Sequence, residues 1–127
     1  MKTILSTNKA PAPVGPYVQG TGAGGFLFTA GQLGMDPATG KMCAPTFREQ
    51  AVQALKNVET VLAAGGATLA DVVKVNVYVA DLSKFGEFNE AYKSFFREPF
   101  PARTTVEANL PAGGLVEVDA VAWVGKE

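Results

Sequence analysis

The stretch from Val72 to Ala80 limits the possible folds of this chain most narrowly, because a valine stands at every second position. Successive side chains of a β-strand point to opposite faces, so this alternation predicts a strand with one apolar and one polar face. The expected apolar face consists of Val73, Val75, Val77 and Val79, and the polar face of Lys74, Asn76 and Tyr78. A face of valines must be covered, and we expect it to lie under helices.

Two stretches with apolar residues at helical spacing flank this strand. The first helix is predicted to begin at a capping box, Thr46 followed by Glu49, and to stop at Gly65-Gly66. Its apolar stripe consists of Phe47, Ala51, Leu55, Val58 and Leu62. The second helix is predicted to begin near residues 81–83 and to end before Pro99. Its stripe is aromatic and consists of Phe85, Phe88, Tyr92, Phe95 and Phe96.

Four further strands are predicted toward the ends of the chain. A proline-rich, extended lead-in over 9–16 comes before strands at 17–20 and 25–33, which we expect to form a hairpin through residues 21–24. Strands at 103–110 and 115–124 flank the segment 111–114, whose two glycines suit a second hairpin. The order ββ, α, β, α, ββ predicts a single α+β domain over residues 1–127, with both helices on one face of the sheet.

The composition excludes several classes of protein. With 11 basic and 12 acidic residues and no cluster of Lys and Arg, the chain lacks the charge that nucleic-acid binding requires. It has no histidine and one cysteine, Cys43, so we expect no internal disulfide, no metal site and no histidine base, and we assign the thiol no role. It has neither an apolar leader nor a run of about 18 apolar residues, so we expect a cytoplasmic protein that does not bind membranes. Only 18% of its residues are charged and 47% are hydrophobic, which favours an oligomer.

Alternation also groups the charged residues of the last two predicted strands. One side of the first strand carries Arg103, Thr105 and Glu107, and one side of the second carries Glu117, Asp119, Val121 and Trp123. The complementary sides, with Val106 and Ala108 on the first strand, are apolar. We therefore expect them in the core and the arginine and carboxylates together on the other face of the sheet. A face that places a tryptophan beside charges suits an interface containing a wet pocket. The alternative is that Arg103 pairs with one of the three acidic residues on a solvated sheet, and spacing does not decide between the two.

Six short motifs occur in order over nearly the whole chain. They are Gly15-Pro16-Tyr17-Val18-Gln19, Thr29-Ala30-Gly31-Gln32, Asn57-Val58, Asp81-Leu82, Phe88-Asn89-Glu90-Ala91-Tyr92 and Phe100-Pro101-Ala102-Arg103. Together they resemble the RidA/YjgF family of enamine and imine deaminases. The resemblance implies a chorismate-mutase-like (ferredoxin-like) subunit with one mixed sheet, in a homotrimer whose sheets form a central barrel and whose active sites lie between subunits. It also implies a hydrolase without cofactor or metal. Such an enzyme would convert 2-iminobutanoate or 2-iminopropanoate, products of pyridoxal-phosphate dehydratases, to the 2-keto acid and ammonia.

The resemblance assigns catalytic roles to three residues. Arg103 would bind the substrate carboxylate, Glu117 would orient or activate water, and Tyr17 would close one wall of the pocket. The side chains suit this chemistry, because an imine carbon is already electrophilic and needs no covalent nucleophile. The planar fork of an arginine matches a carboxylate.

Four further residues are implied as substrate contacts. They are Ala30 and Gly31 through their backbone, Asn89, which would line the site or its subunit contact, and Thr105. Thr105 departs from the family, because many relatives have a cysteine at this position. This chain therefore has no thiol there for chemistry or for regulation by oxidation.

Several of these residues also have plainer interpretations. Tyr17 could be a buried strand aromatic, Asn89 an ordinary polar residue on the second helix, and Gly31 a glycine needed for a bulge or close packing. We interpret Asp119 as a structural or interface charge rather than a catalytic one.

Two other functions compete with the deaminase. A non-catalytic module of the same fold would use Arg103 to bind a 2-keto acid or another small carboxylate. An RNA-directed nuclease, sometimes attached to relatives, fits poorly with a net charge of −1 and no histidine.

Overall fold

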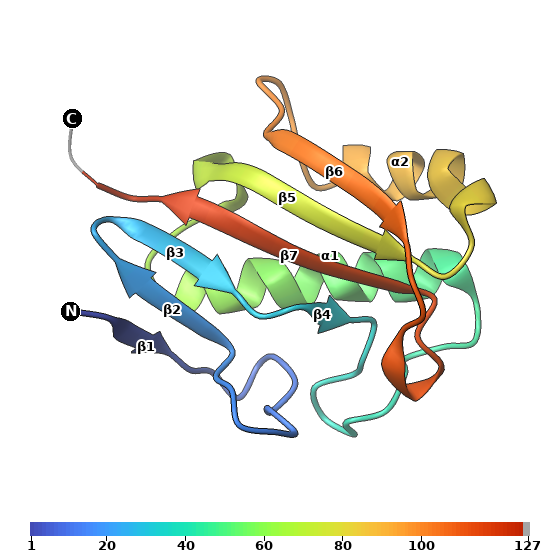
Figure 1. Cartoon of the computed structure of the whole chain (residues 1–127), viewed down its shortest axis with the longest axis horizontal. Helices are drawn as coiled ribbons and strands as arrows, with labels where there is room; N and C mark the ends of the chain where they lie inside the picture. The colour runs from blue at the N-terminus through green and yellow to red at the C-terminus, as the bar shows by residue number, and fades with distance from the viewer. Residues whose placement is uncertain (126–127) are drawn as a thin grey trace.

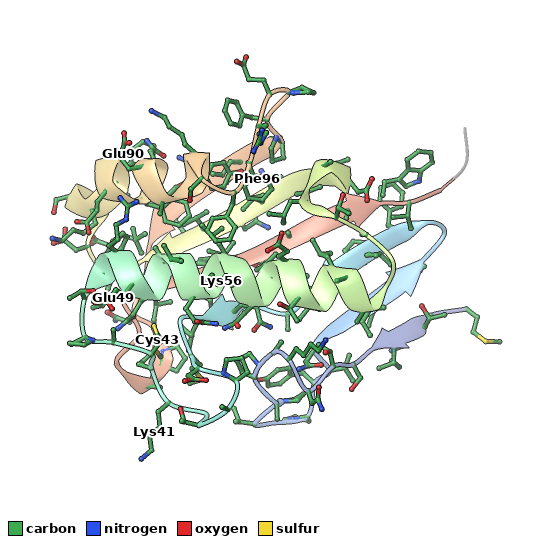
Figure 2. The ribbon with its side chains drawn as sticks, turned by 180° about the vertical axis from the view of Figure 1, so that it is seen from behind. Lys41, Cys43, Glu49, Lys56, Glu90 and Phe96 are labelled. Carbon is green, nitrogen blue, oxygen red and sulfur yellow. The ribbon has the colours of Figure 1, made fainter. Side chains whose placement is uncertain are left out.

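The computed structural model describes residues 1–125 as one β-sheet with two helices against it (Figure 1). The strands are β1 (Thr3–Leu5), β2 (Gly20–Ala23), β3 (Phe26–Thr29), β4 (Gln32–Leu33), β5 (Val72–Val79), β6 (Ala102–Glu107) and β7 (Val116–Trp123). The helices are α1 (Phe47–Ala64) and α2 (Phe85–Lys93), and the short 3-10 segments are η1 (Leu69–Asp71), η2 (Leu82–Lys84) and η3 (Pro111–Gly113). Seen from behind, both helices lie in front of the sheet (Figure 2).

The sheet is mixed, as the family resemblance implies. Its strand order is β1-β2-β3-β7-β5-β6, and the short β4 also pairs with β7. Strands β5 and β6 run parallel, and the other pairs are antiparallel. The two-helix α+β architecture with both helices on one face is therefore confirmed. No helix within residues 1–125 is long and apolar enough to cross a membrane.

Helix α1 begins and ends where the sequence predicts. The Thr46 side chain caps the helix by accepting from the Glu49 N–H (3.4 Å), and its hydroxyl donates to Glu49 Oε1 (2.7 Å) in place of the backbone bond of a full capping box. At the other end the Gly65 N–H donates to the Leu62 carbonyl (2.9 Å). The stripe between these caps is buried, and Leu55, Val58 and Leu62 are almost fully enclosed. This helix packs over β7, β4 and β3, and its stripe joins the valines of β5 in one core.

Helix α2 is shorter than predicted. The segment from Asp81 first forms η2, where Asp81 Oδ1 accepts from the Ser83 N–H (2.9 Å), and α2 itself ends at Lys93. Phe95 and Phe96 therefore follow the helix, although Phe96 still packs in the core and stacks on Tyr92 at 4.5 Å between ring centroids.

Both predicted hairpins need correction. The turn between β2 and β3 lies at Gly24-Gly25, whose φ angles of 58° and 87° favour glycine, so residues 21–23 belong to β2 rather than to the turn. Strands β6 and β7 form no hairpin at all, because β5 lies between them (Figure 1). Local turn residues identified a change of direction after β6 but carried no information about the strand inserted between the two.

The face assignments need two corrections. A bulge between Val72 and Lys74 turns Val73 outward, where it is 46% exposed, and Val72 takes its place in the core. On β6 the prediction is wrong for the whole strand. Arg103 lies beside Val75 and Thr105 beside Val77, so both are on the helix side, whereas Val106 is 43% exposed on the open face. Alternation along a strand predicts which side chains share a face, but it does not determine which of the two faces is turned toward the core.

Candidate active site

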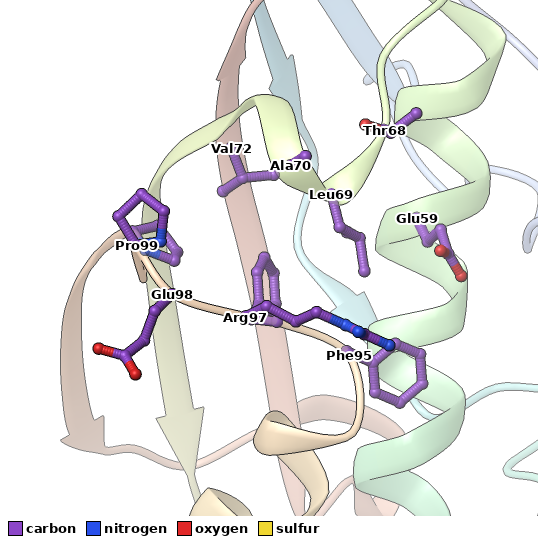
Figure 3. Close-up of a pocket in the computed structure, with 11 residues that line it drawn as sticks. Glu59, Thr68, Leu69, Ala70, Val72, Phe95, Arg97, Glu98 and Pro99 are labelled. Atoms are coloured by element: carbon purple, nitrogen blue, oxygen red, sulfur yellow. The ribbon is translucent and has the colours of Figure 1, made fainter.

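Five of the seven predicted site residues line two separate hollows, and Ala30 and Thr105 line neither of them. The arginine hollow, of about 400 Å³, is bounded by α2 and the start of β6, and its lining includes Asn89, Tyr92, Phe100 and Arg103. The glutamate hollow, of about 170 Å³, is bounded by the lead-in, the segment from Gly31 to Met35 and β7, and its lining includes Tyr17, Gly31 and Glu117. A third hollow of about 350 Å³, between α1, η1 and residues 95–101, contains none of the predicted site residues (Figure 3). Its charged side chains, Glu59, Arg97 and Glu98, are exposed.

Arg103 is held by one face of α2. Its Nη2 donates to Asn89 Oδ1 (2.7 Å), and its guanidinium carbon lies 4.7 to 5.5 Å from the ring centroids of Phe85, Phe88 and Tyr92. These four helix residues follow the spacing i, i+3, i+4, i+7, so they share one face. Asn89 is thus a direct partner of the arginine and not an ordinary polar residue on the helix surface. Within residues 1–125 the guanidinium forms no ion pair, so its charge is available to a ligand in the hollow.

Two hydroxyl groups near this arginine are buried without a hydrogen-bond partner among the described residues. They belong to Tyr92, which is 6% exposed, and to Thr105. Burial raises the pKa of Tyr92 to about 12, although the charge of Arg103 opposes the shift. The Tyr92 phenol is therefore neutral at ordinary pH. The sequence predicts Tyr92 only as a member of the aromatic stripe of the helix. Its contact with Arg103 could not be predicted, because it depends on the parallel pairing of β5 and β6.

Glu117 stands on β7 and faces the open side of the sheet. A Cβ atom at Gly31 would lie 2.8 Å from Glu117 Cδ, so the carboxyl group fits only because residue 31 is glycine. The close-packing interpretation of Gly31 is therefore correct, and the group that packs there is the candidate catalytic carboxyl. Burial raises the pKa of Glu117 above its ordinary value, and the nearby charge of Asp119 raises it further.

Tyr17 directly follows the lead-in and lies outside the strands, since β2 begins only at Gly20. It is 49% exposed, which rules out the buried strand aromatic within this chain, and its hydroxyl accepts from the Val14 N–H (3.3 Å). Ala30 donates its N–H to the Gln19 carbonyl (2.8 Å). A substrate contact through the Ala30 N–H, one of the backbone contacts predicted at Ala30 and Gly31, would therefore compete with this hydrogen bond.

Gln19 is a residue whose importance sequence reasoning missed. Its buried side chain accepts from the Thr7 N–H (2.7 Å) and donates to the carbonyls of Thr7, Ala10 and Pro11 at 2.9, 3.2 and 2.9 Å. Prolines lack the N–H groups that would tie such a segment into a sheet, so a buried amide holds the lead-in by its carbonyls instead. The signal in the sequence was a glutamine directly before a strand and after a proline-rich stretch, which is too common to stand out.

One chain does not bring the two central residues together. Arg103 is registered with Val75 on β5, and Glu117 is registered with Tyr78, which points to the opposite face. The prediction that Arg103 shares a face with Glu117 and Asp119 is therefore wrong, whereas Glu107 does share its face, as predicted. The alternative of an ion pair between Arg103 and one of the three acidic residues is also wrong within residues 1–125. Glu107 instead accepts from the Leu82 N–H (2.9 Å).

Two further residues from the sequence analysis lie elsewhere. Cys43 is exposed and lies apart from both hollows. Asp119 accepts from Asn76 (2.8 Å) on the open face of the sheet.

Comparison with known proteins identifies the fold and the family. The chain superposes on E. coli TdcF with bound serine with a TM-score of 0.91, at 37% identity over 97% of this chain and 99% of that one. A RutC family protein of Pyrococcus horikoshii is 44% identical over 97% of this chain and 98% of its own length. A 2-iminobutanoate/2-iminopropanoate deaminase of Bos taurus is 43% identical over 98% of this chain and 92% of its own.

The fold and its two hollows thus define an α+β protein of the kind seen in RidA and YjgF structures. The sequence model of the family described as Endoribonuclease L-PSP matches residues 7–124. The chain belongs to this family, which includes the RidA, YjgF and RutC proteins.

Proposed function

We propose that this protein is a deaminase that hydrolyses 2-iminobutanoate and 2-iminopropanoate to the 2-keto acid and ammonia. The observation that carries the proposal is Arg103, whose guanidinium is fixed by Asn89 and three aromatic rings, lines a hollow and has no anionic partner within residues 1–125. A planar guanidinium held in this way suits a carboxylate, which both imino acids carry. Relatives about 40 to 43% identical over nearly the whole chain bear the name of this activity, which supports the assignment.

In the proposed reaction Glu117 moves a proton twice. It takes a proton from water as the water oxygen bonds to the imine carbon, which gives a carbinolamine. It then returns that proton to the nitrogen, the C–N bond breaks to release ammonia, and the hydroxyl proton passes to this ammonia as the ketone forms. The sum is one iminium ion and one water converted to one keto acid and one ammonium ion. Burial, which raises the pKa of Glu117, makes this carboxylate a better base than an exposed one.

The site is proposed to form between copies of the chain in a homotrimer. Because Arg103 and Glu117 lie on opposite faces of the sheet, the arginine hollow of one copy must meet the glutamate hollow of another for both to reach one substrate. The open face has apolar surface for such contacts, since Phe26, Phe28 and Val106 are each at least 40% exposed there. Tyr17, Asn89 and Gly31 would then line one shared pocket.

A second candidate function is a module that binds a small carboxylate without turnover. The TdcF structure with bound serine favours it, because an amino acid carries the same carboxylate group. The nuclease named in the family description gains no support from this chain, whose 11 basic and 12 acidic residues give no net positive charge to attract RNA.

The test couples an amino-acid dehydratase to the purified protein and follows keto-acid release by absorbance. We expect acceleration over spontaneous hydrolysis, and we expect Arg103→Lys to lower kcat/KM by roughly 30-fold to several thousandfold, because lysine keeps the charge but loses the two-pronged geometry. Arg97→Lys, an exposed arginine outside both hollows, is the matched control and should leave kcat/KM unchanged.

No acceleration by the wild type on either imine, together with measurable binding of 2-ketobutyrate, would establish the binding module instead. A folded Arg103→Lys protein with wild-type kcat/KM would remove Arg103 from the mechanism.

A further inference from the structure

A polar cluster surrounds Glu117 on the open face of the sheet, where β5 and β7 lie side by side (Figure 1). Asn76 stands directly opposite Asp119, and Tyr78 stands directly opposite Glu117. The two carboxyl groups follow each other at alternate positions of β7, which places their backbones roughly 7 Å apart on one face. The glutamate cluster, defined as Asn76, Tyr78, Glu117 and Asp119, thus contains two acidic groups and no basic one.

Asp119 is fixed in this cluster. Asn76 Nδ2 donates to Asp119 Oδ1 (2.8 Å). Burial, and after it the charge of Asp119, raises the pKa of the neighbouring Tyr78 phenol. Neither acidic residue forms an ion pair within residues 1–125. Lys74, the basic residue on the same face of β5, donates instead to Thr104 Oγ1 (2.8 Å) on β6. The charge of Asp119 is therefore held in place and left unneutralised by its own chain.

We propose that Asp119 is a positioning residue for the deamination, because its fixed negative charge makes the neighbouring Glu117 carboxylate more basic and hence the better acceptor of the proton of water. The proposal rests on the proposed function and departs from the interpretation of Asp119 as a purely structural charge. Asn76 has the supporting task of holding the Asp119 carboxylate by one of its oxygens.

The surroundings of Glu117 assign this effect to Asp119. The titratable groups beside Glu117 are Tyr17, which lines the same hollow, Tyr78 on β5 and Asp119 on β7. Lys74, the basic residue on this face of β5, lies farther along the strand, opposite Val121. Burial raises the pKa of the Tyr78 phenol, so it carries no charge at ordinary pH, and Lys74 turns toward β6. Burial raises the pKa of Glu117 most, and the charge of Asp119 raises it further. This agrees with the position of Asp119 as the charged residue next to Glu117 on the open face of β7.

The test removes the charge of Asp119 and keeps its shape. In Asp119→Asn the amide oxygen still accepts from Asn76, so we expect a folded protein. The Glu117 carboxyl is followed by ¹³C NMR after labelling of the glutamate side chains, with Glu117→Gln used to assign its signal. Its titration midpoint is expected to fall by about half a pH unit to one unit. The acidic limb of the kcat/KM profile should move to lower pH by the same amount, because activity requires ionised Glu117.

Glu59→Gln is the matched control, since it removes one exposed carboxylate on α1, on the far side of the sheet. It should leave both the midpoint and the acidic limb in place. Asp119→Ser, which also lacks the charge, serves as the second variant if Asp119→Asn does not fold.

The two measurements separate this proposal from the proposed function. If the wild type accelerates imine hydrolysis and the variant shifts both the midpoint and the limb, the proposal is supported. An unchanged midpoint, or an unchanged limb in an active enzyme, overturns it. Absence of turnover in the wild type overturns the proposed function directly, and with it any role of Asp119 in deamination, whatever the NMR titration gives.

Discussion

At the scale of single residues, the partners of a side chain decide what it can do, and position in the sequence reveals few of them. Arg103 and Glu117 were identified as candidates by resemblance, but their contacts were not. The stacking of Arg103 on α2 depends on the parallel pairing of β6 with β5, and the fit of Glu117 against Gly31 depends on the short β4 beside β7. Both are pairings between distant segments, which local patterns do not encode.

Thr105→Cys tests whether the missing family cysteine matters. Because an imine needs no covalent nucleophile, we expect kcat/KM to stay within about tenfold of the wild type, equivalent to roughly 1.4 kcal/mol. The Thr105 hydroxyl has no partner among the described residues, so replacing it with a weakly hydrogen-bonding thiol should not lower the free energy of unfolding. Activity in the coupled assay is the measurement, and a rise of several hundredfold would show that threonine had removed a working catalytic group.

Tyr92→Phe tests the buried phenol under the arginine. Removing a hydroxyl without a partner should leave the free energy of unfolding at pH 7 unchanged or raise it by up to about 1 kcal/mol. The pKa of Tyr92 is about 12 in the folded state, above its ordinary value of 10, so the unfolded chain loses this proton first as pH rises. The phenol therefore contributes fully below pH 10, and its contribution is lost between about pH 10 and 12.

Urea unfolding of both proteins at pH 7 and pH 11 measures this difference. The wild type should lose more stability between the two pH values than Tyr92→Phe does. A variant that is already destabilised by more than about 1 kcal/mol at pH 7 would show that the hydroxyl has a partner in solution.

At the scale of elements, the sequence predicts the features that depend on residues close together in the chain, such as the ends of a helix and the extent of a strand. The capping box and the paired glycines gave both ends of α1, and the valine alternation gave the extent of β5 to within one residue. The bulge at Val73 was missed because it depends on the pairing of β5 with β7 rather than on the valine pattern. The order of the strands was missed because it follows from packing of the whole sheet, and a turn sequence such as 111–114 is compatible with either outcome.

Gln19→Leu tests what holds the lead-in that walls the glutamate hollow. Leucine has a similar size but neither donates nor accepts, so the Thr7 N–H and three carbonyls lose their partner. We expect the Thr7 amide to exchange with solvent at least about tenfold faster, with weaker substrate binding through KM, while the amides of β5 keep their protection. Hydrogen exchange followed by NMR is the measurement. Gln53→Leu, a half-buried glutamine of α1 that bonds Asn57, is the control, and equal loss of Thr7 protection in both variants would contradict the clamp.

At the scale of the whole molecule, the separation of Arg103 and Glu117 onto opposite faces of one sheet makes association a requirement of the proposed chemistry. The exposed apolar side chains of the open face agree with this, since a small protein gains stability by covering them. We expect sedimentation equilibrium to give a single species of about 40 kDa, three times the 13.3 kDa of one chain.

Mixed trimers test whether each site takes its arginine and its glutamate from different copies. Trimers made only of Arg103→Ala, or only of Glu117→Gln, should be inactive, because no site then holds both groups. In trimers assembled from the two variants together, a site becomes complete wherever the intact Arg103 of a Glu117→Gln copy meets the intact Glu117 of an Arg103→Ala copy. Random assembly from equal amounts makes about one site in four complete, so co-expression should recover roughly a quarter of the wild-type kcat per site.

The control is to mix the two purified variants under conditions in which trimers do not exchange subunits, which should recover no activity. If co-expressed mixed trimers, verified by mass spectrometry, are also inactive, the two residues act within one copy or not together, and the interface site is wrong. Recovery well above a quarter would also contradict it, because one of the two single variants would then retain a working site of its own.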